Sequence, residues 1–250
     1  MSTVEDLSDH YANFMISPGP EGPGRCAVCW TPCAERYSVC RVCNQQPRHL
    51  DLVLPITFSI DGGAMHNALR GYKDGWSGDA SDQLKNRYTS QLAAVLTRFV
   101  RTHEACAARR LGVARFDVVS IVPSESLERW RLQWIVETGC RPLNDRFERL
   151  LEPTVVAAAG KRFDAGRYTG TRQVAPGTAV LLVDDTWTSG ASAQSAAAAL
   201  RAAGVRKIAL IVFGRHIQPA WEPEYGSGVT NAEVLKRPPP WRWEVCALGA

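Results

Sequence analysis

The sequence predicts an α/β fold, in which an open, mostly parallel sheet carries helices on both faces, plus a small cysteine-rich module near the N-terminus. Two observations lead to this prediction. Apolar strand-like runs alternate with segments of helical periodicity, and five of the eight cysteines fall within residues 26–43. A chain of 250 residues that is 45% hydrophobic is long enough for one main domain and a small accessory module.

Changes in composition divide the chain into four parts. We expect a flexible N-terminus over residues 1–24, the cysteine module over 25–50, the main domain over 51–218 and a Pro/Trp-rich segment over 219–250. The first residues are acidic, and no run of about 18 uncharged apolar residues occurs. These features predict a soluble, cytoplasmic protein that does not associate with membranes.

Four cysteines in the module form two Cys-x-x-Cys pairs, Cys26/Cys29 and Cys40/Cys43, with ten residues between the pairs. Each pair can turn two thiolates toward one point, which together gives a tetrahedral site for structural Zn²⁺ in a zinc ribbon. The alternative is a disulfide framework, but a reducing compartment favours metal binding. Cys33 lies between the pairs and is left out of the ligand set, as a free thiol or a substitute ligand. A closed four-thiolate site leaves no position for a substrate.

The first half of the main domain reads as strand, helix and strand. Residues 51–60 predict a short strand with alternating apolar positions. A long amphipathic pattern from Asp82 to Arg110 predicts a crossover helix that ends at Gly112. Residues 116–123, FDVVSIVP, are nearly all apolar, as expected for a parallel strand covered on both faces.

The second half is less regular before it repeats the strand and helix pattern. We expect helices around Leu127–Glu137 and Leu143–Val156, followed by a long mobile loop over residues 160–177. Residues 178–185 predict the next strand. The remaining elements are an alanine-rich helix over 191–204, a third parallel strand over 206–214 and one edge strand within 238–245.

The turn after the strand at residues 178–185 carries the chemistry. Asp184 and Asp185 end a buried strand, where two carboxylates are costly unless they meet hydroxyls, a metal or other donors. The residues that follow offer hydroxyls and backbone N–H groups at a helix N-terminus, where a phosphate dianion is favoured. They are Thr186, Thr188, Ser189, Gly190 and Ser192. Carboxylates followed by a phosphate cradle suit a ribose 5-phosphate lying across the turn.

Two other interpretations of this turn are weaker. An ATP-type phosphate loop needs a Gly-rich run ending in Gly-Lys-Ser/Thr, and no lysine occurs in the turn. An ordinary N-capped helix needs neither both acids nor four hydroxyls. The turn therefore predicts a sugar-phosphate site.

Residues 180–192, VLLVDDTWTSGAS, resemble the signature of type I phosphoribosyltransferases, which bind 5-phosphoribosyl 1-pyrophosphate. Together with the paired cysteines, this signature resembles the ComF-like, or amidophosphoribosyltransferase-like, branch of that family, over roughly residues 26–216. The resemblance implies a type I phosphoribosyltransferase-like fold and Mg²⁺ bound with the ribosyl pyrophosphate. It also implies transfer of the phosphoribosyl group to a nitrogen acceptor, with release of pyrophosphate.

By position, the resemblance assigns Asp184 and Asp185 to the ribose hydroxyls. It assigns the 5-phosphate to the residues from Thr188 to Ser192, Ala191 included. Further residues are implied on the pyrophosphate side. They are Ser124 and Ser126 as donors, Lys73 ahead of the long helix, and Lys161, Arg162 and Arg167 in a lid.

The sequence also departs from this branch. LERWRLQWIVETG stands where many members have Arg-Gly-Phe-Asn-Gln, and Trp187 replaces a smaller residue, either to pack or to stack on a base. A second hypothesis is therefore a non-catalytic ComF-like adaptor that works with protein partners in DNA uptake or processing. A third is a regulator that binds nucleic acid through residues 101–176, where Lys and Arg outnumber Asp and Glu.

Overall fold

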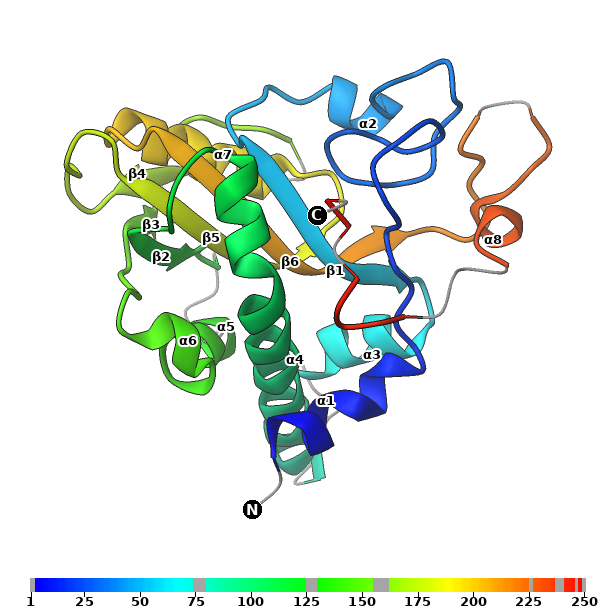
Figure 1. Ribbon diagram of the computed structural model, residues 1–250, viewed down its shortest axis with the longest axis horizontal. Coiled ribbons are helices and arrows are strands. Elements are labelled where there is room, and N and C mark those ends of the chain that lie inside the picture. The colour runs from blue at the N-terminus through cyan, green and yellow to red at the C-terminus, as the bar shows by residue number, and fades with distance from the viewer. Residues whose placement is uncertain are drawn as a thin grey trace.

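The computed structural model describes residues 3–73, 80–124, 130–154, 162–224, 227–236, 241–245 and 247–248. Helices and strands alternate through most of the chain (Figure 1). The helices are α1 (Val4–Ala12), α2 (Arg41–Asn44), α3 (Ala64–Gly71), α4 (Ala80–Arg110), α5 (Arg131–Trp134), the π-helix η1 (Ile135–Gly139), α6 (Arg141–Asn144), α7 (Ala191–Ala202) and α8 (Asn231–Val234). The strands are β1 (Leu52–Ile60), β2 (Val118–Ile121), β3 (Leu151–Pro153), β4 (Tyr168–Gly170), β5 (Ala179–Trp187) and β6 (Lys207–Ile217).

The main sheet has four strands in the order β1-β6-β5-β2, and every neighbouring pair is parallel. The structure thus confirms the α/β class and the parallel sheet. Strand β1 is buried from its first residue to its eighth, so the alternating pattern expected for it is not observed. The reason is that β1 is covered on both faces, which requires apolar residues at successive positions.

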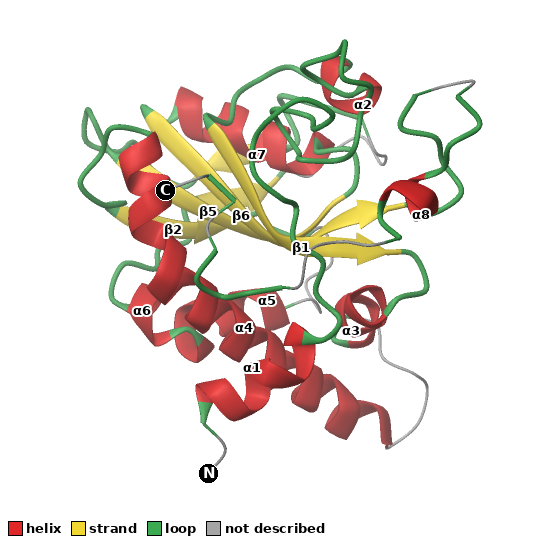
Figure 2. Cartoon of the chain, turned by 45° about the vertical axis from the view of Figure 1, so that its right-hand side comes forward, coloured by secondary structure: helices red, strands yellow, loops and turns green. Residues whose placement is uncertain are grey.

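Helices cover both faces of the sheet (Figure 2). On one face α3 and α4 pack on the strands and α1 packs on α4, with Leu92 and Leu96 of α4 in the same core cluster as Leu181. On the other face α7 and the cysteine module share a cluster with strand residues such as Val180 and Leu210. The cysteine module is therefore part of the main core, on the face that also carries α7.

The region between β2 and β5 differs from the expectation. The helix expected over Leu143–Val156 is wrong. Helix α6 covers only Arg141–Asn144, and β3 pairs in antiparallel fashion with β4, which lies inside the expected loop. Pro153 cannot donate a helical hydrogen bond and disfavours a helical residue before it. Glu148 instead forms an ion pair with Arg172 (2.5 Å), which ties the two segments together.

The helix expected around Leu127–Glu137 is found only in part. Its first residues lie outside the described ones, and α5 leads directly into the π-helix η1. A Cβ at Gly139 would lie 2.8 Å from the Cβ of Ala93 on α4. The close approach of η1 to the long helix therefore requires glycine at this position.

Both terminal segments pack on α4. Residues 1–24, expected to be flexible, contain α1, in which the Tyr11 hydroxyl lies 3.1 Å from Oε1 of Gln91. Near the other end, His103 Nε2 lies 2.7 Å from the backbone oxygen of Trp243. Residues 241–245 form no strand, and the rest of the proline-rich run lies outside the described residues. Within the described parts, no helix has the length and apolar character needed to span a membrane.

Candidate functional site

The turn between β5 and α7 has a backbone that only glycine adopts readily. Gly190 is the N-cap of α7, with φ 81° and ψ −1°. A side chain at this position would also overlap the ring of Trp187, which is only 2% exposed. The indole therefore supports the turn from below and has almost no surface free to stack on a base, which favours the packing interpretation of Trp187.

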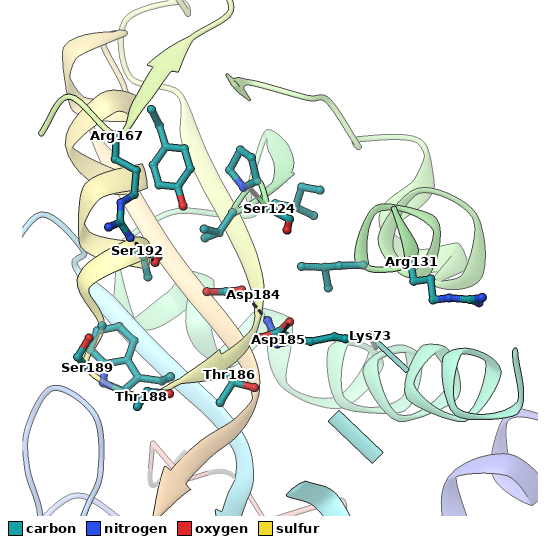
Figure 3. A pocket seen from close by; sticks show the side chains of 18 of the residues that line it. Lys73, Ser124, Arg131, Arg167, Asp184, Asp185, Thr186, Thr188, Ser189 and Ser192 are labelled. Atoms are coloured by element: carbon teal, nitrogen blue, oxygen red, sulfur yellow. Dashed lines mark hydrogen bonds and ion pairs between the residues drawn. The ribbon is translucent and has the colours of Figure 1, made fainter. Parts of the chain in front are cut away.

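A pocket of about 550 Å³ opens at the carboxyl ends of β2 and β5 (Figure 3). Ligands of α/β proteins bind at this edge of an open parallel sheet. The predicted residues that line the pocket are Lys73, Ser124, Arg167, Asp184, Asp185, Thr186, Thr188, Ser189, Gly190 and Ser192. Residues far apart in the sequence are thus brought to one cavity of a size that suits a small molecule.

The two aspartates have different environments within this pocket. Asp185 is held by the two residues that follow α3. Its Oδ2 accepts a hydrogen bond from the Tyr72 hydroxyl (2.6 Å) and lies 2.5 Å from Nζ of Lys73. Asp184 accepts a hydrogen bond from the backbone N–H of Asp185 (2.8 Å) and lines the pocket. The structure therefore fixes one carboxylate and leaves the other directed at the cavity.

The electrostatics of Asp184 follow from this arrangement. Burial raises its pKa to about 8, the adjacent charge of Asp185 adds to the shift, and Lys73 opposes it. A carboxyl with a raised pKa in a pocket is a recurring feature of functional sites. Asp184 is suited to meet ligand hydroxyls or a cation that would stabilise its charge.

The cationic residues predicted for the lid differ in their distance from the pocket. Arg167 is buried, and its Nη1 donates to Oγ of Ser192 (2.8 Å), so it lies at the turn (Figure 3). Arg162 is exposed and does not line the pocket. Lys161 and Ser126 lie outside the described residues. Of the three expected lid residues, Arg167 is therefore the one that the described structure places in the cavity, beside Ser192 at the start of α7.

Two polar residues of the pocket, Tyr72 and Arg131, were not predicted from the sequence, and one predicted residue, Ala191, lies beneath the surface. Arg131 lines the cavity and contacts Asn86 Oδ1 (2.8 Å) and the ring of Trp130, and Tyr72 binds Asp185. Ala191 is only 2% exposed and packs under the turn. The position of Tyr72 directly before Lys73 was a usable signal, whereas Arg131 reaches the pocket only through the tertiary fold.

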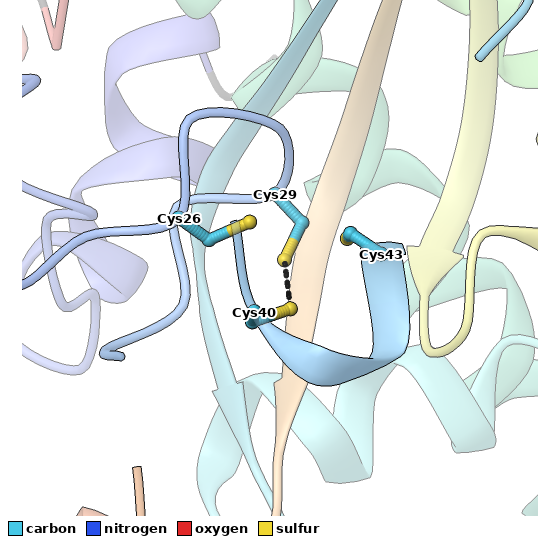
Figure 4. A group of neighbouring side chains, drawn as sticks. All are labelled: Cys26, Cys29, Cys40 and Cys43. Carbon is cyan, nitrogen blue, oxygen red and sulfur yellow. Dashed lines mark hydrogen bonds between the residues drawn. The ribbon is translucent and has the colours of Figure 1, made fainter. Parts of the chain in front are cut away.

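The cysteine site consists of the four predicted ligands. The sulfur atoms of Cys26, Cys29, Cys40 and Cys43 all lie within 4.8 Å of one another (Figure 4). The Cys29 and Cys40 sulfurs are 3.8 Å apart. A tetrahedral centre with Zn–S bonds of about 2.3 Å requires sulfur separations of about 3.8 Å. The four cysteines can therefore bind a structural metal such as zinc.

The thiols of the cysteine group are coupled to one another, and the fifth cysteine of the module lies apart from them. Hydrogen bonds from Cys29, Cys40 and Cys43 lower the pKa of Cys26, while hydrogen bonds with Cys26 and Cys29 raise the pKa values of Cys40 and Cys43. Cys33 lies outside the group, and its sulfur contacts the backbone oxygen of Tyr37 at 3.4 Å. The structure thus places Cys33 outside the four-cysteine group, a point that the sequence had left open.

A buried arginine lies beside the cysteines. Arg215 of β6 is 6% exposed. Its burial alone would lower its pKa, but the charge of Cys29 and a hydrogen bond to that sulfur outweigh the effect, so the pKa of Arg215 is raised. This contact could not be predicted from the sequence, because Arg215 and Cys29 are far apart in the chain.

Comparison with known proteins gives no family assignment: no family model matches the chain, and no curated protein matches it significantly. Any proposal about function therefore depends on the residues and geometry of the two sites.

Proposed function

We propose that this chain is a phosphoribosyltransferase with a type I, ComF-like fold. It binds 5-phosphoribosyl 1-pyrophosphate with Mg²⁺ and transfers the phosphoribosyl group to a nitrogen acceptor. The observation that carries the proposal is the pocket in which the acid pair, Asp184 and Asp185, lies beside the hydroxyl-rich turn at the start of α7. Helix N-termini bind phosphate, and the adjacent carboxylates match the hydroxyls of a ribose.

The roles of the turn follow from its groups. The 5-phosphate is bound by the hydroxyls of Thr188, Ser189 and Ser192 and by backbone N–H groups of the first turn of α7. Arg167, next to Ser192, adds a positive charge at the same end. Gly190 provides close approach of the backbone to the phosphate, since it has no side chain.

The acid pair orients the sugar. Asp184 accepts hydrogen bonds from the ribose hydroxyls, which stabilise its charged form against the burial that raises its pKa. Tyr72 and Lys73 keep Asp185 in place, so that the pair presents one open and one fixed carboxylate. Such prior positioning lowers the entropy cost of reaching the reactive geometry.

The reaction requires no covalent enzyme intermediate. The bond between C1 of the ribose and the pyrophosphate oxygen breaks, pyrophosphate leaves with its electron pair, and the acceptor nitrogen forms a bond to C1 and loses a proton. Mg²⁺ bound together with the ribosyl pyrophosphate would supply positive charge that stabilises the leaving pyrophosphate. Ser124, which lines the pocket, is placed to donate a hydrogen bond to the pyrophosphate oxygens.

The cysteine group is proposed to hold zinc in a purely structural role. Its four sulfurs fill a tetrahedral shell and leave no open coordination position. Because the cysteines lie in the core cluster beside α7, we expect the bound zinc to stabilise the fold and to take no part in the reaction.

Calorimetric titration with 5-phosphoribosyl 1-pyrophosphate and Mg²⁺ tests the donor assignment. We expect binding by the wild type and at least a tenfold loss of affinity in Asp184→Asn, because a charged hydrogen bond contributes about 1.5–3 kcal/mol. Asp145→Asn is the matched control, since that side chain is 78% exposed. Equal affinities in the wild type and Asp184→Asn would refute the ribose role.

A second assay distinguishes catalysis from binding alone. Pyrophosphate release is measured with the ribosyl pyrophosphate and a series of nucleobases and amines. We expect release with at least one acceptor. Tight binding without release for any acceptor would instead favour the non-catalytic ComF-like adaptor.

A further inference from the structure

Arg215 has an unusual environment for a buried cation. Within the described part of the chain it has no carboxylate partner, and its Nε has no hydrogen-bond partner. Its Nη1 donates to the backbone oxygens of Trp187 (3.1 Å) and His216. The Arg215 side chain also forms a hydrogen bond with the sulfur of Cys29. The guanidinium thus lies between the cysteine group and the last residue of β5.

A buried guanidinium is costly unless an anion compensates it. A zinc ion bound by four thiolates carries a net charge of −2, since the thiolates contribute −4 and the ion +2. Arg215 lies where it can compensate part of that charge. The arginine and the loaded cysteine site therefore stabilise each other, although they come from opposite ends of the sequence.

Trp187 continues the connection from Arg215 to the pocket. Its backbone oxygen accepts from Arg215, β6 pairs with β5 at these two residues, and its ring lies against Gly190. Gly190 begins α7, whose first turn forms the floor of the pocket. A continuous set of contacts thus leads from the cysteine sulfurs to the backbone of the phosphate-binding turn.

We propose that Arg215 is a positioning residue that fixes the phosphate-binding turn to the metal centre, so that metal occupancy of the four cysteines controls anion affinity in the pocket. The anion is taken to be the phosphate of the ribosyl pyrophosphate, and in this respect the inference rests on the proposed function. With the metal bound, Arg215 is held between the negatively charged cysteine site and the backbone oxygen of Trp187. Trp187 in turn keeps Gly190 in place. Without it, the guanidinium loses its counter-charge and the support under the turn is weakened.

The test uses the full-length protein and the variant Arg215→Met, which keeps much of the side-chain volume but removes the charge and the donors. We expect the variant to retain one zinc per chain, as measured by metal analysis. Hydrogen exchange of the amides of residues 187–192 should become at least about tenfold faster, and affinity for the ribosyl pyrophosphate should fall about tenfold, as expected for loss of a charged hydrogen bond.

Two further variants separate positioning from general loss of stability. Arg201→Met removes another arginine, which forms an ion pair with Asp51 (2.6 Å) at the amino ends of β1 and β6, and we expect it to leave exchange at residues 187–192 unchanged. Arg215→Lys keeps a charge but lacks the planar fork, and it should restore part of the protection and affinity. This conservative variant also keeps the test usable if Arg215→Met does not fold.

The outcomes distinguish the inference from the proposed function. If the wild type binds the ribosyl pyrophosphate and zinc-loaded Arg215→Met shows unchanged exchange and affinity, the positioning role is overturned while the donor assignment stands. If the wild type does not bind that ligand but Arg215→Met still loosens residues 187–192, the donor assignment fails and the positioning role is upheld. Equal loosening in Arg201→Met would also overturn the specific role of Arg215.

Discussion

The cysteine group and the aspartate pair are both clusters of acidic ligands at the sheet, but the chain manages their charge in opposite ways. The cysteines are buried, surround one point and have Arg215 beside them. Asp184 faces an open pocket, and its raised pKa shows that its charge is poorly compensated in the free protein. The first cluster is complete once a metal binds, so it stabilises the fold. The second keeps a deficit of favourable contacts that a ligand can supply, as functional sites commonly do.

The largest effect expected from this contrast concerns the metal ligands. Cys43→Ser should lose the metal and lower the free energy of unfolding by about 4 kcal/mol or more, because binding of a structural metal is coupled to folding. Metal analysis and chemical denaturation measure the two quantities. Cys33→Ser is the matched control and should retain one zinc per chain, since Cys33 lies outside the group. Loss of zinc in the control as well would mean that the ligand set is misassigned.

The next effect concerns the support that Trp187 gives to the turn between β5 and α7. Gly190→Ala should lower the free energy of unfolding by about 3 kcal/mol, because the left-handed backbone costs about 1 kcal/mol and overlap with Trp187 adds about 2. Gly177→Ala has a similar φ of 90° with no atom within 4 Å, so it should cost only about 1 kcal/mol. Urea denaturation gives both values, and equal costs would show that Trp187 does not fill the space under Gly190.

The two clusters were predicted from sequence because each is encoded within a short segment. The spacing of Cys26, Cys29, Cys40 and Cys43 implies one metal site, and residues 184–192 carry acids and hydroxyls in a fixed order. Long apolar runs likewise located the parallel strands. Local sequence is sufficient wherever the chemistry depends on neighbours along the chain.

The contacts between segments could not be predicted in the same way. Arg215 reaches the cysteines, and Arg131 reaches the pocket, only because the fold brings distant residues together. The short strands β3 and β4 were missed because three residues carry too little periodicity, and the buried pair Leu150 and Leu151 fits a helix as well as a strand. Tertiary packing against α7 decides such segments.

A smaller effect is expected for the pH dependence caused by Asp184. Its folded pKa of about 8 lies above the ordinary value of 3.8, so the folded state binds the proton more tightly than the unfolded state. Its contribution to stability is therefore complete below about pH 4 and is lost as the pH rises to about 8. Asparagine does not titrate, so Asp184→Asn should not show this loss of stability at high pH. We expect the free energy of unfolding of this variant, relative to that of the wild type, to be about 2 kcal/mol higher at pH 8.5 than at pH 5. This is less than the full shift implies, because the pocket is open to solvent.

Denaturation at the two pH values measures this effect, with Asp145→Asn as the control. The Asp145 side chain is 78% exposed, so its replacement should change stability by similar amounts at both pH values. A pH-independent difference between wild type and Asp184→Asn would show that the pocket compensates the charge of Asp184 as well as the cysteine site compensates its own.

The smallest expected effect concerns two serines of α7, Ser192 and Ser195, of which we expect only one to contribute to ligand binding. Oγ of Ser192 accepts from Arg167 (2.8 Å), and Oγ of Ser195 accepts from the backbone N–H of Asp164 (3.0 Å), so both serines fasten the same segment to α7. Replacement of either by alanine should cost about 1 kcal/mol of stability. Ser192 lines the pocket and Ser195 is fully buried, so only Ser192→Ala should also weaken binding of the ribosyl pyrophosphate, by about tenfold. Calorimetry on the two variants decides the point, because equal affinities would place the phosphate away from the first turn of α7 and leave Arg167 with a role in packing alone.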